Sequence, residues 1–125
     1  MQKTVVLIDD DPDDLYMMRE AINNIESTVN CVEFSYPDEA VQSLTEGAVP
    51  NYIFIDINMP RKSGVECLLD LQRIVRLKGV PMIMCSTSMP EKTKAEVLQL
   101  GAKFAFQKPV SLNEYLVLLK RILKD

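Results

Sequence analysis

The chain has 125 residues, 47% of them hydrophobic, with 18 acidic against 14 basic side chains and a formal net charge of -4. This length and composition fit one domain with a sizeable core, residues 1–125, and the scattered basic side chains argue against a nucleic acid held by its phosphates. Because the apolar runs are too short to span a bilayer and the N-terminus lacks a secretion signal, we expect no membrane partner and a cytoplasmic location.

Short apolar segments are typical of five β-strands, in chain order at residues 4–9, 30–35, 52–56, 81–86 and 103–107. A helical pattern of apolar residues follows each strand, at 15–25, 40–44, 65–75, 94–98 and 112–123. The last pattern is the clearest, and Ser111 with Glu114 predicts a capping box at its start. Strict alternation of strands and helices predicts a doubly wound α/β fold, with a parallel sheet covered by helices on both faces.

Polar side chains cluster where the predicted strands end, and ligands of such sheets lie beyond the carboxyl ends of the strands. Carboxylates gathered there repel one another unless a cation lies among them, and Mg²⁺ accepts carboxylates, waters and often a phosphate. A lysine and a hydroxyl at the same edge are suited to hold phosphoryl oxygens. The residues at these ends are Asp9, Asp10, Asp56, Ser86, Thr87 and Lys108.

The aspartates after the first strand have simpler interpretations. Asp11, Asp13 and Asp14 stand where the first helix begins, and negative charge there is stabilised by the helix dipole. We interpret those three as capping residues without a chemical role, and Asp9 and Asp10 alone could be solvated loop residues. A calcium-binding loop is a poor match, because Asp14 occupies the position that needs glycine and a strand precedes the run where that motif requires a helix.

Cysteine and histidine usage narrows the chemistry further. Cys31, Cys67 and Cys85 are widely spaced with no C-x-x-C, so we interpret them as buried, reduced thiols. The chain has no histidine, which removes phosphohistidine chemistry and imidazole metal ligands from it. Any metal should therefore be a hard cation held by oxygen.

Four segments, "LIDDDPDD", "IFIDINMPRKSGVE", "PMIMCSTS" and "GAKFAFQKP", resemble in order and spacing the signature segments of response-regulator receiver domains of two-component signalling. The resemblance covers essentially the whole chain and implies a flavodoxin-like fold with strand order 2-1-3-4-5. It also implies a role for each matching residue, with Mg²⁺, or alternatively Mn²⁺, as the cofactor. By resemblance Asp56 is the phosphoacceptor, Asp9, Asp10 and the Asn58 carbonyl join it as metal ligands, Ser86, Thr87 and Lys108 bind the phosphoryl group or switch, and Pro109 follows a cis peptide bond.

The resemblance implies a signalling partner on each side. The phosphoryl donor would be a phosphohistidine on a histidine kinase or histidine phosphotransfer protein, and the aspartyl phosphate would hydrolyse with time. The protein would catalyse its own phosphorylation and dephosphorylation only, and would otherwise not be an enzyme. Because the chain stops at Asp125, just after the last predicted helix, we expect a stand-alone receiver that acts by docking a downstream protein target.

Two positions depart from the family pattern. The usual aromatic residue three before the lysine is replaced by Ala105, between Phe104 and Phe106, and the usual small residue after the switch hydroxyl is replaced by Thr87. Two other functions compete with this one. An aspartyl-nucleophile phosphatase needs a second carboxylate two residues after Asp56 as general acid, and this chain has Asn58 there. A receiver that only docks a partner without phosphorylation stays open as the alternative.

Overall fold

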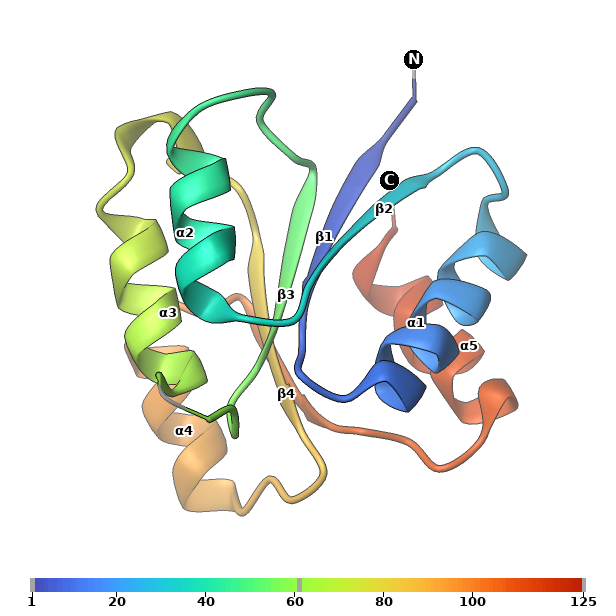
Figure 1. Ribbon diagram of the computed structural model, residues 1–125. Coiled ribbons are helices and arrows are strands. Elements are labelled where there is room, and N and C mark those ends of the chain that lie inside the picture. The colour runs from blue at the N-terminus through green and yellow to red at the C-terminus, as the bar shows by residue number, and fades with distance from the viewer. Residues whose placement is uncertain (1, 61, 125) are drawn as a thin grey trace.

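The computed structural model describes residues 2–60 and 62–124, in which five β-strands alternate with five α-helices (Figure 1). Each strand lies within one residue of its predicted ends, and a short 3₁₀ helix, η1 (Val75–Leu77), was not predicted. The strands are β1 (Thr4–Ile8), β2 (Asn30–Phe34), β3 (Tyr52–Asp56), β4 (Met82–Ser86) and β5 (Phe104–Gln107). The helices are α1 (Pro12–Ile25), α2 (Pro37–Thr45), α3 (Gly64–Gln72), α4 (Glu91–Gln99) and α5 (Leu112–Ile122).

The strands form one parallel sheet in the order β2-β1-β3-β4-β5, which confirms the predicted flavodoxin-like, doubly wound fold. In Figure 1 the sheet is seen nearly edge-on, with α1 and α5 on one face and α2, α3 and α4 on the other. The central strands β3 and β4 are buried along their whole length, whereas the edge strand β2 is mostly half-buried. Burial on both faces explains why the central strands read as nearly continuous apolar runs.

The helix starts carry the expected capping residues. Asp11 caps α1, and its side chain accepts a hydrogen bond from the Asp13 backbone N–H at 2.9 Å. Ser111 caps α5 as predicted, and its hydroxyl oxygen accepts from the Glu114 backbone N–H at 3.2 Å. A complete capping box, which was not predicted, begins α3. These caps satisfy backbone N–H groups that the first helical turn leaves without partners.

The sheet divides the hydrophobic core into two halves of different composition. The half under α1 and α5, here called the aromatic half, holds four buried aromatic side chains together with one buried methionine, Met18. The half under α2, α3 and α4, here called the methionine half, holds four buried methionines and Ala105. The aromatic side chains are Tyr52, Phe54, Phe106 and Tyr115, and the methionines are Met59, Met82, Met84 and Met89.

Among the described residues, none of the helices has both the length and the apolar character that a bilayer crossing requires.

Candidate functional site

Three carboxylates converge at the carboxyl edge of the sheet, where the strand order reverses between β1 and β3. Asp9 follows β1 directly and Asp56 is the last residue of β3, and these strands are hydrogen-bonded neighbours. The two side chains are buried, with 2% and 4% of their residue surface exposed, whereas Asp10 is exposed. One oxygen of each of the three lies within 4.8 Å of the others. The predicted convergence of strand ends is therefore confirmed for these residues.

Lys108 lies at the centre of this cluster and is 8% exposed. Its backbone N–H donates to the Ser86 carbonyl at 2.8 Å, which extends the pairing of β4 and β5 by one residue. Its ammonium group donates to Asp9 at 2.7 Å and lies 3.1 Å from an Asp56 carboxylate oxygen. One buried cation thus holds together carboxylates from two strands.

Asp14 completes the cluster, and the interpretation of Asp14 as a capping residue only was wrong. Its carboxylate accepts from the Lys108 ammonium at 2.7 Å across 94 residues of sequence. Asp14 lies in the first turn of α1, as expected, but the fold brings this turn close to Lys108, which directly follows β5. The position of Asp14 in the sequence indicated only that its charge would be stabilised by the helix dipole. Its contact with Lys108 depends on the tertiary structure and could not be predicted in the same way.

The predicted cis bond before Pro109 is also wrong, because the described residues contain no cis peptide bond. The trans form is the intrinsically favoured isomer even before proline. The Lys108 ammonium reaches Asp9, Asp14 and Asp56 with this bond trans. The geometry of the cluster therefore does not require the cis form.

The pKa values of these groups reflect their burial and the excess of negative charge around them. The pKa of Asp56 is raised from 3.8 to about 6, chiefly by burial and then by the charge of Asp9, while Lys108 partly opposes both effects. Burial also raises the pKa of Asp9, against hydrogen bonds from Lys108 and the Asp11 backbone. For Lys108, burial would lower the pKa, but the hydrogen bonds to Asp14 and Asp9 outweigh it and the pKa is raised. The lysine stays charged beside an excess of carboxylates.

The site has the donor set that a hard divalent cation prefers. Asp9, Asp10 and Asp56 could hold a metal ion, each through one carboxylate oxygen. Such oxygens suit Mg²⁺, which keeps several of its waters, and the exposure of Asp10 leaves room for them. An added cation would also oppose the two effects that raise the pKa of Asp56, its burial and the repulsion from Asp9.

Ser86 and Asn58 are joined by a hydrogen bond that the sequence did not indicate. Ser86 ends β4 and is fully buried, and its hydroxyl oxygen accepts from the Asn58 side-chain amide at 2.9 Å and from the Ser88 backbone N–H at 3.3 Å. The Asn58 amide therefore anchors the hydroxyl beside β3, the strand that ends at Asp56. Thr87, the next residue, is exposed.

Gly64 packs closely against the backbone of Asp56 and Ile57, at a distance that only glycine allows. A Cβ atom at position 64 would lie 2.1 Å from the Asp56 carbonyl oxygen and 2.7 Å from Ile57 Cα. The Gly64 backbone N–H donates to the Ile57 carbonyl at 2.8 Å. The first turn of α3 is thus pressed against the backbone that carries Asp56, a role for which glycine is needed because it has no side chain.

Comparison with known proteins identifies the family of this chain. The family model of the response regulator receiver domain matches residues 5–120, so the chain belongs to the receiver domains of two-component signalling. The sequence is 26% identical over 110 residues to the autoinducer 2 sensor kinase/phosphatase LuxQ of Vibrio vulnificus, covering 88% of this chain and 12% of that protein. It is 27% identical over 122 residues to the phosphate regulon transcriptional regulatory protein PhoB of Pseudomonas aeruginosa, covering 98% of this chain and 52% of that protein. The chain thus spans about half or less of the length of these relatives.

Solved structures show the same fold. The phosphorylated cyanobacterial phytochrome response regulator RcpA superposes with a TM-score of 0.86 at 26% identity, over 98% of this chain and 91% of that one. The Vibrio cholerae chemotaxis protein CheY4 superposes with a TM-score of 0.84 at 22% identity, over 98% of this chain and 99% of that one. At 22% identity, the similarity to CheY4 shows only that the fold is shared.

Proposed function

We propose that this receiver domain accepts a phosphoryl group on Asp56 and changes conformation to regulate a protein partner. The observation that carries the proposal is the contact of Asp56 with Lys108 at 3.1 Å, within 4.8 Å of the two other carboxylates. The donor would be a phosphohistidine on a histidine kinase or a histidine phosphotransfer protein, since this chain has no histidine. The membership in the receiver family supports this assignment of donor.

The chemistry needs an ionised Asp56 and neutralisation of the incoming group. With a pKa of about 6, most of the Asp56 carboxyl groups are ionised at neutral pH. A carboxylate oxygen forms the new O–P bond while the P–N bond to the donor imidazole breaks, and the imidazole leaves with the electron pair and takes up a proton. Lys108 would turn toward the phosphoryl oxygens.

Asp9, Asp10, Asp56 and the Asn58 carbonyl are the residues that would hold Mg²⁺ or Mn²⁺. When bound, the cation supplies positive charge to the phosphoryl oxygens, which a carboxylate nucleophile otherwise repels. The protein then acts on no substrate except its own Asp56. We place this reaction in the cytoplasm, in keeping with three unpaired cysteines, two of which are buried.

Intact-protein mass spectrometry tests the phosphoacceptor. The protein should gain one phosphoryl group from acetyl phosphate in the presence of Mg²⁺, and Asp56→Asn should gain none. Asp13→Asn is the matched control, because Asp13 is an exposed aspartate of the same segment and should leave the uptake unchanged. Uptake by Asp56→Asn equal to that of the wild type, or uptake undiminished by a chelator, would contradict the proposal.

We further propose that the loop after β4 moves together with α4 when Asp56 is phosphorylated. Ser86 would turn toward the phosphoryl oxygen and give up its present bond with Asn58, and the space that it leaves must be refilled. Ala105 is too small to refill it. Phe104 and Phe106 pack in the aromatic half, on the face of β5 opposite to Ala105, as strand alternation predicted. A movement of the loop and α4 is then the available response.

Amide NMR with beryllofluoride as the phosphoryl mimic tests this switch. We expect shifts in residues 86–100 and along the surface of β5 and α5. Shifts confined to the carboxylate cluster would favour the passive docking alternative. If Phe104→Ala or Phe106→Ala removed the remote shifts but not the phosphorylation of Asp56, an aromatic side chain would carry the signal and the proposed route would be wrong.

A further inference from the structure

Tyr115 carries a buried hydroxyl that has no hydrogen-bond partner among the described residues. It is the fourth residue of α5 and lies in the aromatic half with 1% of its surface exposed. Leaving a buried polar group unpaired costs about 1–3 kcal/mol. Phenylalanine would fill the same space without that cost, so a buried, unpaired phenol requires an explanation.

The hydroxyl lies near the charged cluster. α5 packs beside α1, and both helices begin at the carboxyl edge of the sheet (Figure 1). Side chains in a helix lean toward its N-terminus, so the phenol leans toward this edge. Burial raises the pKa of Tyr115, and the charged groups that act on the phenol include Lys108, Asp14 and Asp9.

The contacts of Lys108 leave no ammonium hydrogen for the phenol. An ammonium group has three hydrogens, and those of Lys108 face Asp9, Asp14 and Asp56. Phosphorylation of Asp56, on which this inference rests, would turn Lys108 toward the phosphoryl group. Asp9 would then bind the cation, but Asp14 would lose its ammonium contact and gain no new partner.

We propose that Tyr115 is a positioning residue of the phosphorylated state, whose hydroxyl donates a hydrogen bond to the Asp14 carboxylate when Lys108 turns away from it. The bond joins the first turn of α5 to the first turn of α1, directly behind the lysine. It therefore stabilises the arrangement in which Lys108 faces the phosphoryl group. In the resting protein the same hydroxyl makes no hydrogen bond and lowers stability, because it is buried without a partner.

Tyr115→Phe separates the two states because it removes only the hydroxyl. We expect the metal-free variant to be at least as stable in urea as the wild type. Its affinity for beryllofluoride in the presence of Mg²⁺ should fall about tenfold, since a hydrogen bond to a charged group is lost in that state alone. Tyr16→Phe is the matched control, because Tyr16 is 57% exposed and should leave both measurements unchanged.

A double-mutant cycle identifies the partner. In an Asp14→Ala background, Tyr115→Phe should change beryllofluoride affinity less than twofold. An undiminished effect in that background would overturn the assignment to Asp14. The wild-type protein offers a test that needs no variant: the ring Cζ resonance of Tyr115 should shift on adding beryllofluoride, and an unshifted resonance would overturn the inference.

The outcomes distinguish this inference from the proposed function. If beryllofluoride with Mg²⁺ fails to bind the wild type, the phosphoacceptor proposal itself is wrong. If it binds the wild type and binds Tyr115→Phe within twofold of the same affinity, only the role of Tyr115 is wrong.

Discussion

The two halves of the core are built from side chains of different stiffness. In the aromatic half, the rings of Phe54 and Phe106 meet edge to face, with 6.4 Å between their centroids, and α1 and α5 pack against each other. Aromatic side chains have few rotamers, and such ring pairs add directional packing energy. The methionine half is filled by unbranched thioethers, which adapt to changes of shape. A rearrangement on phosphorylation therefore meets least resistance there.

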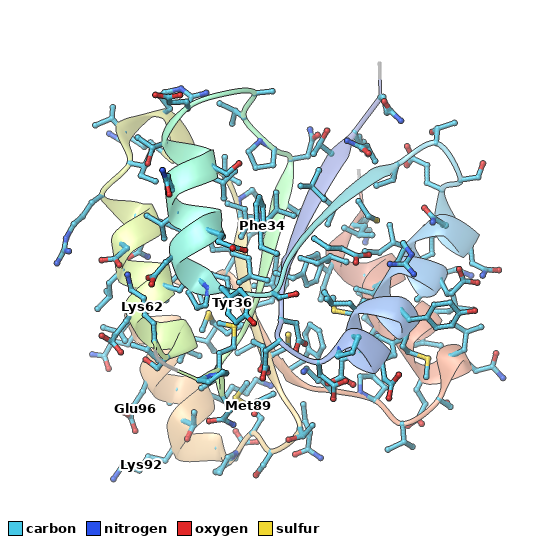
Figure 2. All side chains as sticks on the ribbon, viewed as in Figure 1. Phe34, Tyr36, Lys62, Met89, Lys92 and Glu96 are labelled. Atoms are coloured by element: carbon cyan, nitrogen blue, oxygen red, sulfur yellow. The ribbon has the colours of Figure 1, made fainter. Side chains whose placement is uncertain are left out.

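α4, the helix that we expect to move on phosphorylation, is also only lightly packed against the rest of the molecule. Val97 is the single buried residue of α4, all of whose residues the structure describes. Figure 2 shows Lys92 and Glu96 extending from the outer side of this helix, and Met89 lying by the loop that leads into it. The Met89 backbone N–H donates to the Gln107 side chain at 3.2 Å, which ties that loop to β5. Few apolar contacts hold α4 in place, as suits a segment that shifts.

The largest expected effect compares one side chain from each half. Phe106 and Met89 are 8% and 9% exposed, so they are matched in burial. We expect Phe106→Ala to lower the free energy of unfolding by about 3–5 kcal/mol, and Met89→Ala by about 2 kcal/mol, because the loop around Met89 can collapse into the space. Urea unfolding measures both, and equal losses would remove the distinction between the halves.

Gly64→Ala sharpens the comparison, because it tests a rigid point in the methionine half. The added methyl group would meet the backbone at Asp56 and Ile57, which cannot yield as a methionine side chain does. We expect a loss of about 1–3 kcal/mol in the free energy of unfolding, together with slower phosphoryl uptake as Asp56 is displaced. Stability and uptake both equal to the wild type would show that α3 is free to move away.

Asp56→Asn tests the carboxylate cluster at the edge of the sheet, which lies between the two halves of the core. The raised pKa means that folding disfavours the ionised carboxylate. Below pH 3.8, Asp56 is protonated whether folded or unfolded, and the substitution should change little. As the pH rises through about 6, the wild type should lose stability relative to Asp56→Asn, by on the order of 2 kcal/mol. Urea unfolding of the metal-free proteins at pH 4 and pH 8 measures this loss of stability; the two values lie about two units either side of the folded pKa. A variant less stable than the wild type at pH 8 would contradict the prediction.

Thr87→Ala gives the smallest effect and probes the loop of the methionine half. The threonine methyl and hydroxyl groups should partly shield the Asp56 phosphate from the attacking water. We expect the variant to lose its phosphoryl group about threefold faster, which corresponds to about 0.7 kcal/mol in the barrier. Phosphate release after removal of the donor measures the rate. A rate equal to or slower than that of the wild type would rule out shielding.

Local pattern and sheet topology account for the features that the sequence could predict. Parallel strands bring their carboxyl ends to one edge, so Asp9, Asp56 and Lys108 could be placed together from the sequence alone. The partner of Lys108 on α1 could not, because Asp14 satisfies the local rule for a first-turn acid equally well without it. The need for Gly64 depends on the distance between α3 and β3, which no sequence pattern reports.

The unpaired hydroxyl of Tyr115 was missed for a related reason. Its position in the α5 pattern marks it as a core residue, and the pattern does not distinguish tyrosine from phenylalanine. The bond between Asn58 and Ser86 was likewise hidden, because it joins the loop after β3 to the end of β4, 28 residues away. Side-chain hydrogen bonds between separate elements depend on packing that only the folded chain specifies.

The composition of the methionine half makes it vulnerable to chemical damage. Met59 and Met89 are each 9% exposed, more than the other two buried methionines of this half, Met82 and Met84. Peroxide converts a thioether to a sulfoxide, which is polar and needs a hydrogen-bond donor that an apolar core does not supply. An oxidised Met89 would draw its loop outward, the same segment that phosphorylation should move. The softness that suits this half to a change of shape thus also exposes the loop after β4 to oxidative damage at Met89.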